Sequence, residues 1–241
     1  MNEAEQYEFD VNGYIIYRNV LSEAEQQKLN ELIDAYLGES DRVNFPLLDI
    51  NPYFFELMAK PKTLSILRHL LGDWLRFDHA FGIQVQSGQK VPQGLHGGPR
   101  HHGGSDQYHW VQNKIYCGLV GVSYSLIDVE PGDGGFVCVP GSHKANLPYV
   151  PPINSHLVQN PKVRAGDMVI FTEALVHGYG TWRGKHRRRA LVFKYSPGYA
   201  AAASYDSIAQ YYSMAFTDVQ QDLLRPPSVG MRAYVRFPKP D

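Results

Sequence analysis

Apolar residues recur at helical spacing in two stretches before residue 74. In residues 22–38, Ser22 and Glu25 form a capping-box pattern, apolar positions follow every three to four residues, and Gly38 is a plausible C-cap. Residues 60–71 predict a second helix of the same kind. Each helix is apolar on one face only, so we expect both to pack on a sheet rather than to bind a ligand.

Short apolar stretches bounded by turn residues predict strands over much of the remaining chain. These stretches are residues 13–17, 75–86, 115–127, 136–139, 168–171 and 188–195. The glycine-rich turn at residues 129–135 is expected to fold 136–139 back on 115–127 as a hairpin. Short helices could follow at 206–212 and 217–224. Many short strands, with helices mostly at the start, indicate a mainly β barrel or sandwich with an α cap.

The last two predicted strands carry candidate chemistry in one hairpin-like unit. His177 lies just past the strand 168–171, and Arg188 begins the next strand eleven residues later. A neutral imidazole is the commonest metal ligand, and a guanidinium binds a carboxylate through two parallel hydrogen bonds. We therefore expect a metal ligand and a carboxylate anchor here. Arg187 and Arg189 would point to the other strand face, and they are the alternatives to Arg188.

A glycine- and histidine-rich loop at residues 93–109 is too polar to be core. Loops held on a rigid β scaffold often carry functional sites. The usual ferrous oxygenase site has two histidines and one carboxylate. None of the ten histidines, however, has an acidic residue two positions later.

Three segments resemble the phytanoyl-CoA dioxygenase family, namely residues 10–14, the Pro-Gly-Ser-His-Lys segment 140–144, and 163–197. The resemblance is near full length. It implies a double-stranded β-helix (a cupin-like jelly roll) with N-terminal helices on one sheet, and an oxidative enzyme that uses Fe(II), 2-oxoglutarate and O2. It further implies that His177 binds iron and that Arg188 holds the far carboxylate of 2-oxoglutarate.

The family's spacing also places His96 as the first iron ligand and Gly98 in the position of the carboxylate. His-x-Gly resembles the iron/2-oxoglutarate halogenases, in which chloride takes the place of the missing carboxylate. We therefore favour chlorination of an aliphatic C–H bond in a small molecule. Gly98 is then the catalytic-site residue that differs from the family's carboxylate and leaves room for the halide. The alternative within the family is a hydroxylase whose third site holds water or a carboxylate from Asp106 or Glu173. His102 is the alternative to His96.

A different class of protein is also compatible with the departure at Gly98. A non-catalytic cupin-like barrel that had lost its metal could show the same change at one ligand. Retention of His177, Arg188 and the Gly-Asp turn before them argues against this reading.

The substrate is only weakly indicated. Pocket candidates are Arg100, His102, Tyr116, Gln84, Asn113 and Lys114. A cationic mouth formed by Arg100, His101, His102, His109 and Arg183 would suit an anionic small molecule.

Composition limits the remaining functions. The 241 residues are expected to form one domain, 1–241, as a monomer or homodimer. A formal charge of −1 offers no general field for nucleic acid or an anionic membrane. Two cysteines fit a reducing compartment, and no signal peptide or membrane span is evident. We expect a soluble cytoplasmic protein.

Overall fold

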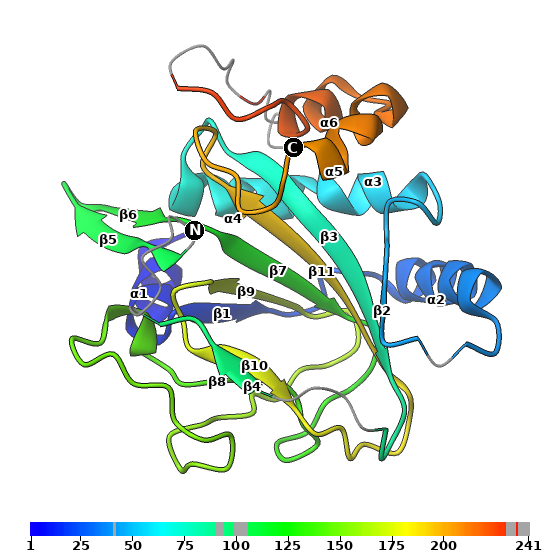
Figure 1. The fold of residues 1–241 in the computed structure, drawn as a ribbon, viewed down its shortest axis with the longest axis horizontal. Coiled ribbons are helices and arrows are strands. Elements are labelled where there is room, and N and C mark those ends of the chain that lie inside the picture. Colours follow the sequence, from blue (N-terminus) through cyan, green and yellow to red (C-terminus); the bar gives the residue numbers. More distant parts are fainter. Residues whose placement is uncertain (41, 90–93, 99–105, 230–234, 236–241) are drawn as a thin grey trace.

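Two antiparallel sheets form the centre of the computed structural model, which describes residues 1–40, 42–89, 94–98, 106–229 and 235. The larger sheet has six strands in the order β1-β9-β7-β11-β3-β2 (Figure 1). Its strands are β1 (Tyr14–Tyr17), β2 (Asn44–Phe45), β3 (Arg76–Val85), β7 (Val120–Ser125), β9 (Met168–Thr172) and β11 (Arg188–Ser196). The second sheet consists of β4 (Gly94–His96), β8 (Gly135–Cys138) and β10 (His177–Gly180), and a separate hairpin pairs β5 (Tyr108–Val111) with β6 (Lys114–Cys117).

Helices cover the outer face of the six-stranded sheet. They are α1 (Glu3–Asn12), α2 (Glu23–Leu37), α3 (Tyr53–Met58), α4 (Pro61–Leu71), α5 (Asp206–Ala209) and α6 (Asp218–Leu223) (Figure 1). One core cluster joins the helices to Leu191, Phe193 and Tyr195 of β11. Because strand side chains alternate between faces, the residues between these three point the other way. Val192 accordingly belongs to the second cluster, between the sheets.

The inner space between the two sheets is partly apolar. Phe136 of β8 packs against Phe171 of β9 with ring centroids 5.0 Å apart. Two facing sheets with N-terminal helices on one of them confirm the predicted jelly roll. Side chains on the inner face of β11 therefore enter the space that a jelly roll offers to a ligand.

The predicted helices are confirmed, and the two capping-box residues explain where the first begins. The Ser22 hydroxyl accepts a hydrogen bond from the Glu25 backbone N–H at the start of α2, and Gly38 follows its end. Helix α1 was not predicted, although Asn2 and Glu5 also form a capping box. Phe9 is the only buried residue of α1, so its apolar periodicity is weak.

Three predicted strand relations are wrong. Residues 115–127 are not one strand, since β6 ends at Cys117 and β7 begins at Val120. β8 pairs with β10 instead of returning on β7. Gly134 and Gly135 both have positive φ, a conformation that redirects the chain cheaply only at glycine.

The expected hairpin of β9 with β11 is also absent, because β7 lies between them. His177 does not follow a strand end but opens β10 in the other sheet. The connection thus crosses the space between the sheets and brings residues 173–177 across it.

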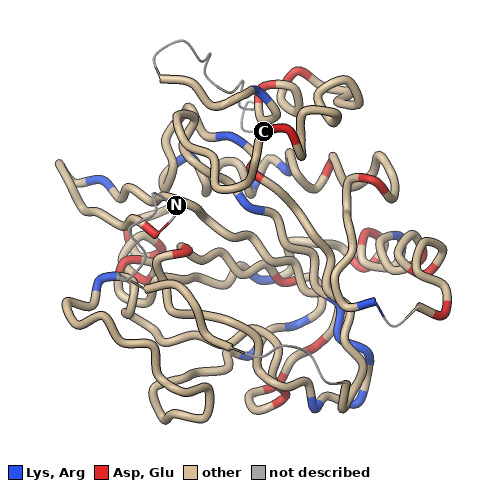
Figure 2. The backbone as a smooth tube through the Cα atoms, in the orientation of Figure 1, with Lys and Arg blue, Asp and Glu red and all other residues tan. Residues whose placement is uncertain are grey.

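Charge is dispersed over the described chain. Figure 2 shows Lys, Arg, Asp and Glu mainly on the helices, on β3 and β11 and in the loops, with both signs interspersed. None of the helices in the described ranges has the length and apolar character needed to cross a membrane.

Candidate metal centre

Three potential ligand side chains meet between the sheets. His96 at the end of β4 and His177 at the start of β10 are direct cross-strand partners, so their side chains lie on the same face. Their ring centroids are 4.3 Å apart. Glu173 reaches them from the turn after β9, and the ligand atoms of all three residues lie within 4.8 Å of one another.

Local hydrogen bonds explain why this turn presents Glu173 and His177 together. The Leu175 N–H donates to the Thr172 carbonyl at 3.0 Å, which closes a tight turn around Glu173. The Val176 N–H donates to the Ser142 hydroxyl at 2.8 Å. The Pro-Gly-Ser-His segment therefore anchors the residue directly before His177.

The charge state of the cluster suits a cation. Burial lowers the pKa of His177 to about 4, against the opposing effect of Glu173, so the imidazole is neutral near pH 7. Its Nδ1 lies 2.7 Å from the Leu175 carbonyl oxygen and donates to it. Nε2 is then free to act as a ligand and lies 3.7 Å from Oε1 of Glu173.

Glu173 is ionised despite being buried. Burial alone would raise its pKa, but chiefly the charge of the nearby Lys194 ammonium lowers the pKa to about 2. Two imidazoles and one carboxylate form the donor set that ferrous iron takes in oxygenases. The residues present therefore fit such an ion.

Arg188 lies on the wall of the same cavity, which has a volume of about 290 Å³. The guanidinium is buried, and it lies 5.4 Å from the centre of the Tyr179 ring. Within the described ranges, no acidic side chain forms an ion pair with it. Gly135 gives it room, because a Cβ there would lie 2.6 Å from Nε of Arg188. A buried cation without an anionic partner is costly, so this wall favours an anionic ligand.

The neighbouring arginine serves the fold. Arg189 points to the helical face, where Nε donates to the Gln84 amide oxygen at 2.9 Å and Nη1 donates to Asn30 of α2. The side chain of Gln84 is thus held by Arg189 and does not line the cavity, contrary to its selection as a pocket residue. Tyr116 of β6 is about half exposed on the small hairpin and does not line it either.

Several other predicted residues fall outside the cluster or outside the described ranges. Arg100, His101 and His102 belong to residues 99–105, whose structure is not described. Asp106 is described and is not part of the three-residue cluster. Of the two carboxylates considered as a third ligand, Glu173 is the one that joins the histidines. Its position four residues before His177 was the sequence feature that could have identified Glu173 as a ligand candidate.

Gly98 has a backbone role that the sequence does not reveal. Its φ is +85°, and its N–H donates to the Ala174 carbonyl at 2.9 Å. A Cβ at this position would lie 2.8 Å from Cγ2 of Val176. Glycine is therefore required by the local conformation, and the carboxylate missing from this position is present on Glu173. A halide in its place has no support here.

We expect Gly98→Ala to destabilise the protein, since left-handed backbone costs an L-residue about 1–2 kcal/mol and the methyl group would press on Val176. Urea unfolding would measure the loss. Gly94 is the matched control, because among the described residues no atom lies within 4 Å of a Cβ built there and its φ is not positive. Equal stability of Gly98→Ala and Gly94→Ala would contradict the backbone explanation.

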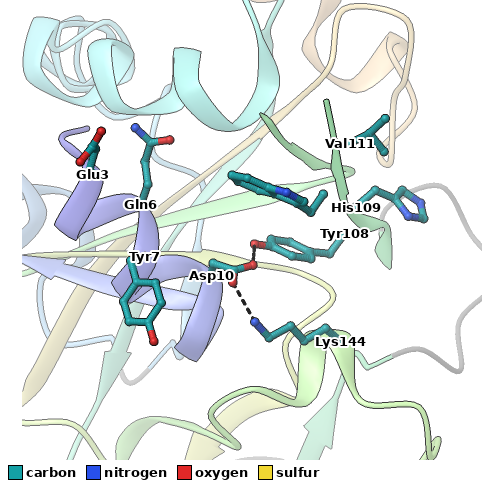
Figure 3. Close-up of a pocket in the computed structure, with 9 residues that line it drawn as sticks. Glu3, Gln6, Tyr7, Asp10, Tyr108, His109, Val111 and Lys144 are labelled. Atoms are coloured by element: carbon teal, nitrogen blue, oxygen red, sulfur yellow. Dashed lines mark hydrogen bonds and ion pairs between the residues drawn. The ribbon is translucent and has the colours of Figure 1, made fainter. Parts of the chain in front are cut away.

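A larger hollow, of about 700 Å³, lies outside this site between α1 and the β5–β6 hairpin. Figure 3 shows Asp10 at its base, where the carboxylate accepts hydrogen bonds from Tyr108 at 2.6 Å and from Lys144 at 2.9 Å. His143 also contacts the Asp10 carbonyl oxygen, at 3.0 Å. These contacts attach α1 to the chain near the Pro-Gly-Ser-His segment. Among the described residues, the lining of this hollow contains no cluster of potential metal ligands.

Several solved structures share this fold, and two of those named here contain 2-oxoglutarate. HygX from Streptomyces hygroscopicus, with nickel and 2-oxoglutarate bound, has a TM-score of 0.76 at 24% identity, and the match covers 83% of this chain and 89% of HygX. EctD from S. alaskensis, with 2-oxoglutarate and 5-hydroxyectoine, has a TM-score of 0.62 at 20% identity, covering 82% and 76%. SnoN, a non-heme alpha ketoglutarate dependent epimerase from nogalamycin biosynthesis, has a TM-score of 0.63 at 16% identity, covering 84% and 87%. Likeness at these identities establishes the fold.

Sequence comparison identifies the family. No curated protein sequence matches the chain. The family described as phytanoyl-CoA dioxygenase (PhyH), however, matches residues 9–190, which is well over half of the 241 residues. The match spans both histidines, Glu173 and Arg188. The chain therefore belongs to the phytanoyl-CoA dioxygenase family.

Proposed function

We propose that this protein is an Fe(II)- and 2-oxoglutarate-dependent oxygenase that hydroxylates an aliphatic C–H bond of a small molecule. The observation that carries the proposal is the convergence of His96, Glu173 and His177 in one cavity with Arg188, which has no acidic partner among the described residues. HygX, EctD and SnoN support it as relatives in fold that are described with 2-oxoglutarate or as dependent on it.

Each residue has a separate task in this proposal. His96, Glu173 and His177 would hold the iron, and Arg188 would bind the far carboxylate of 2-oxoglutarate, because a guanidinium suits a carboxylate. The iron and 2-oxoglutarate supply oxygen activation when bound. Phe136 and Phe171 form an apolar part of the cavity wall and limit access of water to the metal centre.

The three-residue donor set supports one of the two alternatives within the family. A carboxylate at the third position leaves no missing ligand for chloride to replace, so hydroxylation is favoured over halogenation. The convergence of three ligand side chains also argues against a barrel that has lost its metal.

A histidine on the substrate side was not predicted from the sequence. Lys194 of β11 pairs with His79 of β3 and Tyr195 pairs with Phe77, so Asp78 is an extra residue in a β-bulge. Bulges near active sites redirect side chains. His79 lines the cavity, and its Nδ1 lies 2.7 Å from Oδ1 of Asp78. We assign His79 the task of orienting a polar group of the substrate through Nε2.

The substrate class rests on the relatives. HygX has been solved with hygromycin B and EctD with 5-hydroxyectoine, both small molecules. The predicted cationic mouth has little support. His109 lines the larger hollow beside α1 and Arg183 lines a third hollow, so neither residue lines the cavity of the metal centre. A polar small molecule is therefore the proposed substrate.

The test is anaerobic addition of Fe(II) and 2-oxoglutarate, followed by oxygen. The weak visible charge-transfer band of the iron chelate should form, and oxygen should then convert 2-oxoglutarate to succinate. Polar small molecules that accelerate succinate formation are candidate substrates, and their products should carry a hydroxyl group with or without chloride. Absence of the band would contradict the metal centre, and a chlorinated product would favour the halogenase alternative.

Arg188→Met should raise the 2-oxoglutarate concentration needed for band formation, since removing one partner of a desolvated charge pair costs on the order of 2–5 kcal/mol. Iron binding alone should change much less. Arg187→Met is the control, because Arg187 is not among the residues that line the cavity. If the control variant shows the larger loss, the wrong arginine has been assigned.

A further inference from the structure

Lys194 is a buried cation inside the candidate metal centre. It lies on the inner face of β11, and its Nζ forms an ion pair and hydrogen bond with Oε1 of Glu173. Both side chains are largely buried, at 7% and 12% exposed. Nζ also lies 4.5 Å from the centre of the Phe171 ring. Lys194 therefore contacts both a carboxylate and an aromatic ring from one position in the cavity.

The ion pair uses the oxygen that a metal would need. Oε1 of Glu173 is also the atom that faces Nε2 of His177, at 3.7 Å. A divalent ion held between these two atoms would lie close to the ammonium group. Like charges repel strongly where little water screens them, so the ion and Lys194 compete for one oxygen.

The pair has a clear use when no metal is bound. A buried carboxylate without a counter-charge is strongly destabilising, and a buried partner removes most of that cost. When an ion takes Oε1, the ammonium can move away from that oxygen and keep its cation–π contact with Phe171, which is already present.

We propose that Lys194 is the internal counter-ion of Glu173 in the metal-free protein, and that a divalent ion displaces it from Oε1 on binding. Lys194 is thus a positioning residue that lowers metal affinity while it preserves the metal-free fold. This inference rests on the proposed function only in taking His96, Glu173 and His177 as the ligands.

The test compares Lys194→Met with the wild type, using Co(II) as an oxygen-stable probe whose visible absorption reports binding. Methionine nearly preserves length and removes the charge. The variant should bind Co(II) at least about tenfold more tightly, because the competing charge is gone. The melting temperature of its metal-free form should fall, and Co(II) should raise that temperature by more than it does in the wild type.

Lys60→Met is the matched control, since Lys60 forms a partly buried ion pair with Glu25 at 2.6 Å on the helical side. It should leave Co(II) affinity unchanged. Equal or weaker Co(II) binding by Lys194→Met would overturn the inference, whereas failure of the wild type to bind Co(II) or Fe(II) would overturn the proposed function instead.

Two further measurements cover poor folding of Lys194→Met. Lys194→Gln keeps a hydrogen-bond donor without the charge and should show the same gain in affinity. A crystal structure of the wild type with Co(II) bound should show Nζ of Lys194 moved away from Oε1. An unbroken contact between Lys194 and Oε1 in that structure would refute displacement.

Discussion

Glu173→Gln should abolish tight Fe(II) binding and oxygen-dependent succinate formation while the jelly roll remains folded. The amide has nearly the same shape as the carboxylate but carries no charge for the ion. Loss of a residue that only supports a ligand typically costs 10–100-fold in metal affinity, and loss of one of three ligands should exceed that range. Metal titration under nitrogen and far-UV circular dichroism would measure binding and folding separately.

Stability must be separated from ligation in this experiment, because Glu173→Gln also leaves the buried Lys194 without its partner. The double variant Glu173→Gln/Lys194→Met removes both charges and should recover stability without recovering iron binding. Asp106→Ala is the second comparison. Because Asp106 lies outside the cluster, this variant should bind iron as the wild type does. Loss of iron in Asp106→Ala, with Glu173→Gln unaffected, would reassign the third ligand.

Asp78→Ala should produce the largest loss of stability outside the metal centre, on the order of 3–5 kcal/mol, because it leaves a buried charge unpaired. The Asp78 carboxylate is buried and accepts from Nη1 of Arg76 at 3.0 Å, and from the N–H groups of Ala202 and Ala203 at 2.9 Å each. It also contacts His79. Its removal would leave Arg76 unpaired and detach residues 202–203 from the sheet. Urea unfolding would give the free-energy difference.

Asp128→Ala is the matched control. Asp128 also accepts a backbone N–H, from Ala165 at 2.9 Å, and pairs with Arg164 at 2.8 Å, but its side chain is 57% exposed. Exposed ion pairs typically contribute less than about 1 kcal/mol, so the loss should be much smaller. The double variant Arg76→Met/Asp78→Leu should be more stable than Asp78→Ala. If Asp78→Ala costs no more than Asp128→Ala, the buried network does not stabilise the protein.

Features that depend on neighbours in the chain could be predicted from the sequence. Ser22 and Glu25 mark the start of α2 because a capping box is completed within one turn. Strand alternation places Arg188 and Arg189 on opposite faces of β11, and the family spacing selected Arg188, which lines the cavity, while Arg189 lies at the helices. The jelly roll and the two histidines of the cluster could be predicted through the family resemblance.

Tertiary structure decided which strands pair and which carboxylate reaches the histidines. β8 was expected on β7 but lies beside β10, because backbone pairing joins residues far apart in the chain and local pattern does not encode it. Gly98 looked like a missing ligand, yet its positive φ belongs to a contact with Ala174 that no sequence pattern displays. Glu173 joins His96 only because the chain crosses between the sheets, and Lys194 reaches it from a third strand. The charge balance of the site is therefore a property of the folded arrangement, since His96, the turn that carries Glu173 and His177, and Lys194 come from three separate parts of the chain.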